Sequence, residues 1–224
     1  PIVFTSAGNP ETWTQKLKNH NIIVVHVVSN LKFAIKAINA GVDALVCEGF
    51  EAGGHNGKEE ITSFCLIPLM KKNVHIPLIA AGGISSGNSM LAAMILGADG
   101  VQIGSRFVMS KESSAHINFK NKIASLSAGD TILTLKEITP VRMIKNDFYF
   151  ELKNAYLNNA SVKELNDILG KGRAKKGMFL GDLVNGELEI GQISCLLEKI
   201  QSASEIIEEI ITGFNLAKFN ISQL

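Results

Sequence analysis

Short, continuously apolar segments recur along the chain and alternate with segments in which apolar residues return every three or four positions. Five apolar segments are predicted strands, at residues 1–5, 22–28, 44–48, 77–81 and 100–104. Because each is apolar on both faces, the strands are typical of a parallel sheet that helices cover on both sides. Helical spacing in the intervening segments, such as residues 31–40 and 88–96, completes a βαβα pattern and an α/β fold class.

From residue 131 onward the pattern becomes mainly helical. Predicted helices cover residues 142–158, 161–169, 190–199 and a last segment that follows Ser202. Ser202 and Glu205 have the spacing of a capping box at the start of that last helix. We therefore divide the chain into residues 1–130, which carry the predicted strands, and residues 131–224, a helical extension with closing helices.

Composition and charge exclude several classes of protein. The 22 Lys and Arg residues against 21 Asp and Glu residues leave a net charge of +1, unlike the strong positive charge of a nucleic-acid-binding protein. A hydrophobic share of 46% argues against disorder, and the apolar runs are too short to span a membrane. Three widely spaced cysteines fit a soluble protein of the reducing cytoplasm, and we expect Cys47 and Cys65 to be buried. The histidine spacing predicts no metal site.

Glycine-rich turns follow the last two predicted strands. Gly82 and Gly83 come directly after residues 77–81, and Gly104 and Ser105 end the next strand. Glycines let the backbone approach an anion closely, so two consecutive turns of this kind can share one phosphate group, although either alone could be a tight turn. In a (β/α)8 barrel the phosphate site follows strands 7 and 8, which favours a barrel that here lacks its first three βα units over a five-stranded doubly wound sheet.

A histidine follows the third predicted strand in a turn that contains several glycines. His55 comes after Gly53 and Gly54, at the end of the sheet where catalytic groups gather in such folds, and an imidazole there can transfer protons near neutral pH. An exposed loop histidine without a function is the alternative. Glu48, at the junction of strand and loop, could orient a sugar hydroxyl or be a solvated carboxylate.

Residues 170–177, a second glycine-rich segment, carry four cations. The segment follows a predicted helix, and its last glycine precedes Met178 where a P-loop would continue with Lys-Ser or Lys-Thr. We therefore interpret it as a solvated loop.

Four motifs resemble one family. They are EGFEAGGHNG, IPLIAAGGISSG, GADGVQIGSRFVMSKESSAH and TPVRMIKN. Together they resemble the flavin-dependent enoyl-acyl carrier protein reductase II, within the wider nitronate monooxygenase, or 2-nitropropane dioxygenase, family. The resemblance covers nearly the whole chain and implies an FMN-binding (β/α)8 TIM barrel with a helical extension near its C-terminus. Members of the family begin with three further strand-helix units.

The resemblance also implies roles for individual residues. His55 matches the active-site histidine, and Glu48 favours the reductase branch because monooxygenases of the family tend to have Gln at that position. The FMN phosphate would lie at the two turns described above, and a third turn would lie beside the flavin. The cofactor-binding residues implied in this way are Ser6, Ala7, Gly8, Glu48, Gly53, Gly54, Ala81, Gly82, Gly83, Gln102, Gly104 and Ser105.

The resemblance leads us to predict the reduction of the 2,3-double bond of enoyl-acyl carrier protein thioesters in fatty acid synthesis, with NADH or NADPH as co-substrate. His55 would supply a proton or polarise the thioester carbonyl. A monovalent cation is a further candidate ligand, and we expect a homodimer that binds neither nucleic acid nor membrane. The first alternative is a nitronate monooxygenase that oxidises nitroalkanes with O2. A purine-nucleotide dehydrogenase, in which Cys65 would have to be the nucleophile, and a non-catalytic phosphate binder rank lower.

Overall fold

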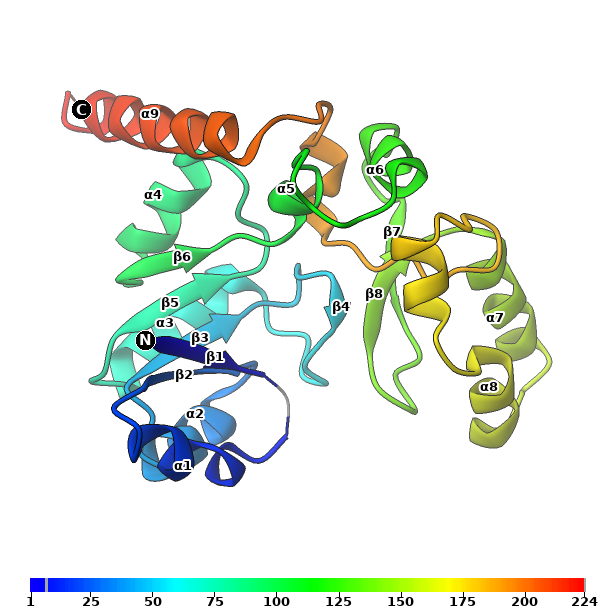
Figure 1. The fold of residues 1–224 in the computed structure, drawn as a ribbon, viewed down its shortest axis with the longest axis horizontal. Coiled ribbons are helices and arrows are strands. Elements are labelled where there is room, and N and C mark those ends of the chain that lie inside the picture. The colour runs from blue at the N-terminus through cyan, green and yellow to red at the C-terminus, as the bar shows by residue number, and fades with distance from the viewer. Residues whose placement is uncertain (7, 224) are drawn as a thin grey trace. The chain divides into compact units, whose positions relative to one another are not determined.

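The computed structural model describes residues 1–6 and 8–223, which divide into two compact units (Figure 1). Unit 1 consists of Pro1–Glu51, Glu59–Ile103 and Glu209–Leu224. Unit 2 consists of Ala52–Lys58 and Gly104–Glu208. Within the described residues, no helix is both long enough and apolar enough to cross a membrane.

Unit 1 is built on a five-stranded parallel sheet, which confirms the five predicted strands and the α/β class. Its strands are β1 (Ile2–Thr5), β2 (Ile23–Val28), β3 (Ala44–Glu48), β5 (Leu78–Ala81) and β6 (Gly100–Gln102), in the order β1-β2-β3-β5-β6. All four strand pairs are parallel. The central strand β3 is buried on both faces, as its continuous apolar run predicts.

Helices connect these strands. They are the 3-10 turn η1 (Pro10–Thr12), α1 (Thr14–Lys18), α2 (Leu31–Asn39), α3 (Ser63–Asn73) and α4 (Gly87–Ile95). The predicted helices at residues 31–40 and 88–96 are therefore confirmed as α2 and α4. Leu66, Ile67 and Met70 of α3 pack against Leu45 and Leu78 of the sheet in the main core of this unit. Burial of such side chains contributes about 1.5–3 kcal/mol each to folding.

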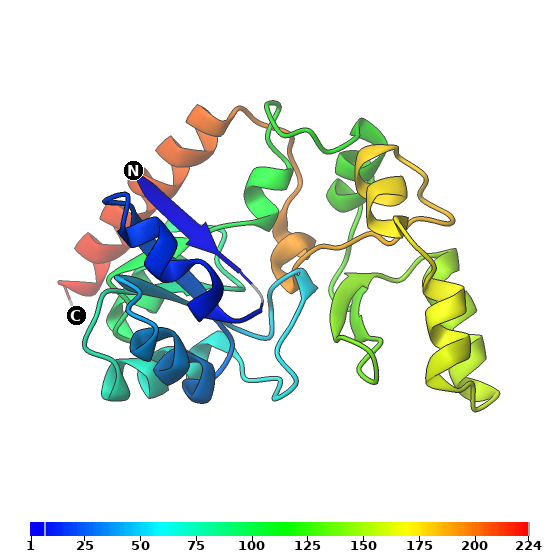
Figure 2. The same cartoon turned by 60° about the horizontal axis from the view of Figure 1, so that its bottom comes forward.

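Unit 2 contains a three-stranded antiparallel sheet and most of the remaining helices. The sheet has the order β4-β8-β7, with β4 (Gly54–His55), β7 (Thr131–Thr134) and β8 (Val141–Ile144). Its helices are α5 (Ser105–Val108), α6 (Ile117–Ala124), α7 (Asp147–Leu157), α8 (Val162–Leu169), the π-helix η2 (Lys175–Phe179) and the 3-10 helix η3 (Gln192–Leu196). Helices α7 and α8 lie side by side in both views (Figure 1, Figure 2) and share the apolar cluster of Phe148, Leu152 and Leu165.

Two helix predictions in this part of the chain are wrong. The pattern predicts a helix over residues 142–158, but β8 occupies its first residues and the helix α7 begins only after Asn146. Arg142, the first residue of the predicted helix, lies instead in β8 and is 1% exposed. The pattern also predicts a helix over residues 190–199, where only the short 3-10 helix η3 forms. No side chain caps it.

The two predicted helix starts with serine caps are confirmed. Ser161 and Glu164 form a capping box at α8. At α9 (Ala203–Ile221), the Ser202 backbone N–H donates to the Glu205 carboxylate at 2.6 Å, and the Glu205 backbone N–H donates to the Ser202 hydroxyl at 3.2 Å. Each cap satisfies backbone donors that the first helical turn leaves without partners.

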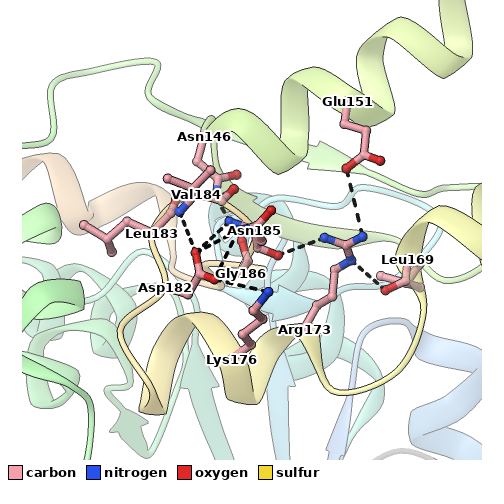
Figure 3. A network of polar contacts seen from close by, with 10 residues as sticks. All are labelled: Asn146, Glu151, Leu169, Arg173, Lys176, Asp182, Leu183, Val184, Asn185 and Gly186. Carbon is pink, nitrogen blue, oxygen red and sulfur yellow. Dashed lines mark hydrogen bonds and ion pairs between the residues drawn. The ribbon is translucent and has the colours of Figure 1, made fainter.

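The cationic segment at residues 170–177 is more ordered than a solvated loop, so that interpretation is wrong for Arg173 (Figure 3). The Arg173 guanidinium donates to the Leu169 carbonyl oxygen at 3.0 Å and to the Asn185 carbonyl oxygen at 2.9 Å. It also lies 4.3 Å from the centre of the Phe148 ring. Lys176 pairs with Asp182 at 3.2 Å. These contacts join the segment to α7 and to the turn that follows η2.

Candidate active site

The carboxyl ends of three neighbouring strands in unit 1 bring predicted site residues into register. Glu48 ends β3 and pairs with Ala81 of β5, and Ala81 pairs with Gln102 of β6. Residues far apart in the sequence therefore lie together at the carboxyl-terminal end of the strands. In open or closed parallel sheets, ligands bind at this end.

Glu48 has a half-buried carboxyl group at this end of the sheet. Desolvation by burial raises its pKa to about 7. Both protonation states are therefore populated near neutral pH, so the group can donate or accept a hydrogen bond. This property suits a residue that orients a hydroxyl group of a ligand.

The turn after β5 has a backbone that only glycine adopts easily. Gly82 has a φ of 92° and Gly83 a φ of 72°. A Cβ atom on Gly82 would lie 2.8 Å from the Gly49 carbonyl oxygen. Among the residues that the structure describes, no acceptor receives the backbone N–H groups of Gly82, Gly83 or Ile84. Such unpartnered backbone donors in a glycine turn can donate hydrogen bonds to the oxygens of a phosphate group.

The second predicted phosphate turn begins unit 2. Gly104 precedes α5, and a Cβ atom there would meet no heavy atom within 4 Å. Ser105 is the first residue of α5, and its hydroxyl oxygen accepts the Gly191 backbone N–H at 3.0 Å. Within the described part of the chain, the Ser105 hydroxyl donates to no acceptor, so its proton is available to a ligand, as the predicted role requires.

His55 lies on the two-residue strand β4, where it pairs with Val141 of β8 and is exposed to solvent. The neighbouring glycines allow two close approaches. A Cβ atom on Gly53 would lie 2.5 Å from the Ile190 carbonyl carbon, and one on Gly54, whose φ is 75°, would lie 2.6 Å from the Glu189 carboxylate oxygen Oε2. The Gly-Gly-His segment therefore lies directly against residues 189–191.

Glu189 is a neighbour of His55 that the sequence analysis missed. Burial raises the pKa of its carboxyl group, and positive charge on His55 acts in the opposite direction. Nearby Glu187 is buried as well, and its pKa is raised to about 7 by burial and by the charge of Glu189. Neither carboxylate belongs to a recognisable motif. Glu189 reaches this place through an isolated antiparallel bridge to Met143, a residue distant in sequence.

The remaining predicted site residues lie after β1. Ser6 is exposed, and Gly8 has a φ of 82° with open space where a Cβ atom would be. Ala7 lies outside the residues that the structure describes. Glycine adopts this φ without strain. Contact of Ser6 and Gly8 with a flavin stays a prediction.

The Cys47 thiol is not poised as a nucleophile, and Cys65 lies elsewhere than predicted. Burial raises the pKa of the Cys47 thiol to about 12, so it stays protonated at neutral pH. The expectation that Cys65 is buried is wrong, because it lies on the exposed face of α3 while Leu66 and Ile67 face the core. Within residues 1–6 and 8–223, no group of three or more His, Cys, Asp or Glu side chains could hold a metal ion.

Comparison with known proteins identifies relatives over almost the whole chain. The model of the family described as Nitronate monooxygenase matches residues 1–213. A probable nitronate monooxygenase from Staphylococcus saprophyticus is 33% identical over 227 residues, which cover 96% of this chain and 63% of the relative. The chain thus spans less than two thirds of the length of this curated relative.

Solved structures share the fold. FabK from Thermotoga maritima is 36% identical, with a TM-score of 0.93 over 100% of this chain and 70% of that one. Nitroalkane oxidase from Streptomyces ansochromogenes is 25% identical, with a TM-score of 0.80 over 99% of this chain and 66% of that one. The five-stranded sheet of unit 1 therefore corresponds to part of a TIM-barrel-type structure.

Proposed function

The chain belongs to the nitronate monooxygenase family, and from this premise we propose that it is part of an FMN-dependent oxidoreductase that reduces 2-enoyl thioesters. Its relatives include a probable nitronate monooxygenase and a nitroalkane oxidase, and both names describe oxidoreductases. The relatives are longer than this chain, so the activity is proposed for the whole protein. In that protein, the five parallel strands would be strands 4–8 of a (β/α)8 barrel.

The observation that carries the proposal is the Gly82–Gly83 turn, whose N–H groups have no acceptor among residues 1–6 and 8–223. These donors fit the phosphate group of FMN. The family resemblance alone implies that Gly104 and Ser105 would contact the same phosphate. Glu48, with its pKa of about 7, would hold a hydroxyl group of the ribityl chain. When bound, FMN would supply hydride transfer from NAD(P)H to the β-carbon of the enoyl group.

His55 would hold the proton that the reaction needs at the α-carbon. Its ring is exposed on β4, so a substrate can reach it. An imidazole nitrogen that carries a proton can donate it to a substrate carbon, which suits a general acid. Alternatively, the protonated ring would polarise the thioester carbonyl by donating a hydrogen bond to its oxygen.

Replacement of His55 by alanine tests this role. We expect His55→Ala to lower the rate of NADH oxidation that depends on a crotonyl thioester by about 10²-fold. His75→Ala is a matched control, because His75 is also exposed but precedes β5 at the opposite end of the sheet from Glu48. Equal rates for the His55 variant and the wild type would remove the histidine from the mechanism.

A nitronate monooxygenase is the second candidate function. The curated relative carries that name, and a nitroalkane oxidase shares the fold. In this reaction His55 would remove the α-proton of the nitroalkane, and O2 would be consumed. We rank this function second because Glu48 stands where monooxygenases of the family tend to have Gln. O2 consumption with 2-nitropropane in the absence of a response to crotonyl thioester would reverse that order.

A further inference from the structure

Ser63, the first residue of α3, is held by a carboxylate from twelve positions earlier in the chain. Its backbone N–H donates to both carboxylate oxygens of Glu51, at 3.0 and 2.9 Å. Thr62 occupies the N-cap position of α3 but provides no side-chain hydrogen bond. Glu51 therefore caps this helix in place of the local residue, and its negative charge lies favourably at the helix N-terminus.

The Ser63 hydroxyl connects the same helix to the turn after β5. Its oxygen lies 2.7 Å from the Gly82 carbonyl oxygen, 3.0 Å from Oε2 of Glu51 and 3.3 Å from the Ala81 carbonyl oxygen. A hydroxyl has one proton, and the shortest of these distances indicates that Ser63 donates mainly to Gly82. The Gly82 carbonyl is thus tied to the start of α3.

This bond determines where the next N–H group points. The peptide bond between Gly82 and Gly83 is trans, so the Gly82 C=O and the Gly83 N–H point in opposite directions. With the carbonyl bonded to Ser63, the N–H of Gly83 must face away from α3. It is one of the three donors that lack an acceptor among the described residues.

The surroundings leave little room for this arrangement to relax. A Cβ atom on Gly49 would collide with the Ser63 hydroxyl and would lie 2.5 Å from Oε2 of Glu51. The Gly49 backbone N–H donates to the Ala81 carbonyl oxygen at 2.9 Å. The end of β3, the start of α3 and the glycine turn are therefore packed as one cluster.

We propose that Glu51 and Ser63 are positioning residues for the phosphate group of FMN: they fix the Gly82–Gly83 peptide so that the Gly83 N–H is presented to the phosphate. The inference rests on the proposed FMN site. Neither side chain needs to touch the flavin. Both would affect only the binding of the phosphate group. Loss of the Ser63 hydroxyl would leave the Gly82 carbonyl without its anchor and allow the peptide to rotate.

The experiment compares FMN with riboflavin, which lacks the phosphate. Fluorescence titration of the apoprotein gives a dissociation constant for each flavin. The riboflavin constant divided by the FMN constant measures the contribution of the phosphate group to binding. We expect Ser63→Ala to raise the FMN dissociation constant about 5- to 10-fold, the effect of one lost hydrogen bond, and to leave that of riboflavin unchanged. Glu51→Ala should act in the same direction.

Two further variants separate positioning from general stability. Glu51→Gln keeps an acceptor for the Ser63 N–H and offers its amide N–H to the Ser63 oxygen, so it should retain the wild-type ratio. Ser161→Ala removes a serine of the same kind, which caps α8 with Glu164 as its partner, and should also retain the ratio.

Each possible result supports or overturns a defined statement. A wild-type ratio near one would refute the phosphate site and with it that part of the proposed function. A large wild-type ratio that is unchanged in both Ser63→Ala and Glu51→Ala would overturn only the positioning role. Equal weakening of FMN and riboflavin would overturn it too, because the damage would then not be specific to the phosphate.

Discussion

At the scale of single residues, burial raises the pKa of several carboxyl groups and so favours their neutral form. Glu187 is 7% exposed, and burial together with the charge of Glu189 raises its pKa to about 7, partly offset by Arg173. The ordinary value is 4.5, so between pH 4.5 and about 7 the folded protein binds this proton more tightly than the unfolded chain does. Stability therefore falls as the pH rises through this window.

Replacement of Glu187 by glutamine should remove this cost. At pH 8, Glu187→Gln is expected to be more stable than the wild type by about 1–3 kcal/mol, and the gain should vanish near pH 4.5. Urea unfolding at the two pH values measures both quantities. Glu198→Gln is the control, because Glu198 is exposed and its substitution should give no such pH-dependent gain. A gain at pH 4.5 as large as at pH 8 would contradict the linkage.

At the scale of elements, the sequence predicts what local patterns determine. The continuous apolar runs identify the five parallel strands. Ser161 and the Ser202–Glu205 capping box identify the starts of α8 and α9. Strand β8 is missed because the apolar spacing of residues 142–158 predicts one helix, whereas Arg142 lies buried in the sheet. Of the candidate site, the glycine turns and His55 are visible in the sequence. Glu51 is not, since its partner Ser63 is defined only by tertiary packing.

The element that carries His55 depends on one glycine. A Cβ atom on Gly53 would lie 2.5 Å from the Ile190 carbonyl carbon and 2.6 Å from the Gly191 nitrogen, both of them backbone atoms that cannot rotate away. Gly53→Ala should therefore displace β4 and lower the free energy of unfolding by about 1–3 kcal/mol. Gly100→Ala is the control, because a Cβ atom there meets nothing within 4 Å. Denaturant unfolding of both variants measures the difference, and equal stabilities would show that this contact relaxes.

At the scale of the whole molecule, both compact units are discontinuous in the sequence. Unit 1 takes three segments of the chain and unit 2 takes two. Periodicity describes neighbouring residues and so cannot reveal that residues 52–58, between two segments of unit 1, belong with residues 104–208. The segment that makes this excursion contains Gly53, Gly54 and His55. The segment that interrupts unit 1 thus carries the motif to which we assign the proton transfer.

Binding of FMN should be visible in the stability of the molecule as a whole. A ligand that binds only the folded state, at 100 times its dissociation constant, stabilises a protein by about 2.7 kcal/mol. For a chain of this size each kcal/mol raises the melting temperature by about 2–4 °C, so FMN should raise it by about 5–10 °C. Differential scanning calorimetry of the apoprotein with and without FMN measures this shift. Adenosine monophosphate at the same concentration provides the control, because it offers a phosphate without an isoalloxazine ring. An equal shift with both nucleotides would mean that the glycine turn binds phosphate groups in general and that the protein has no particular affinity for flavin.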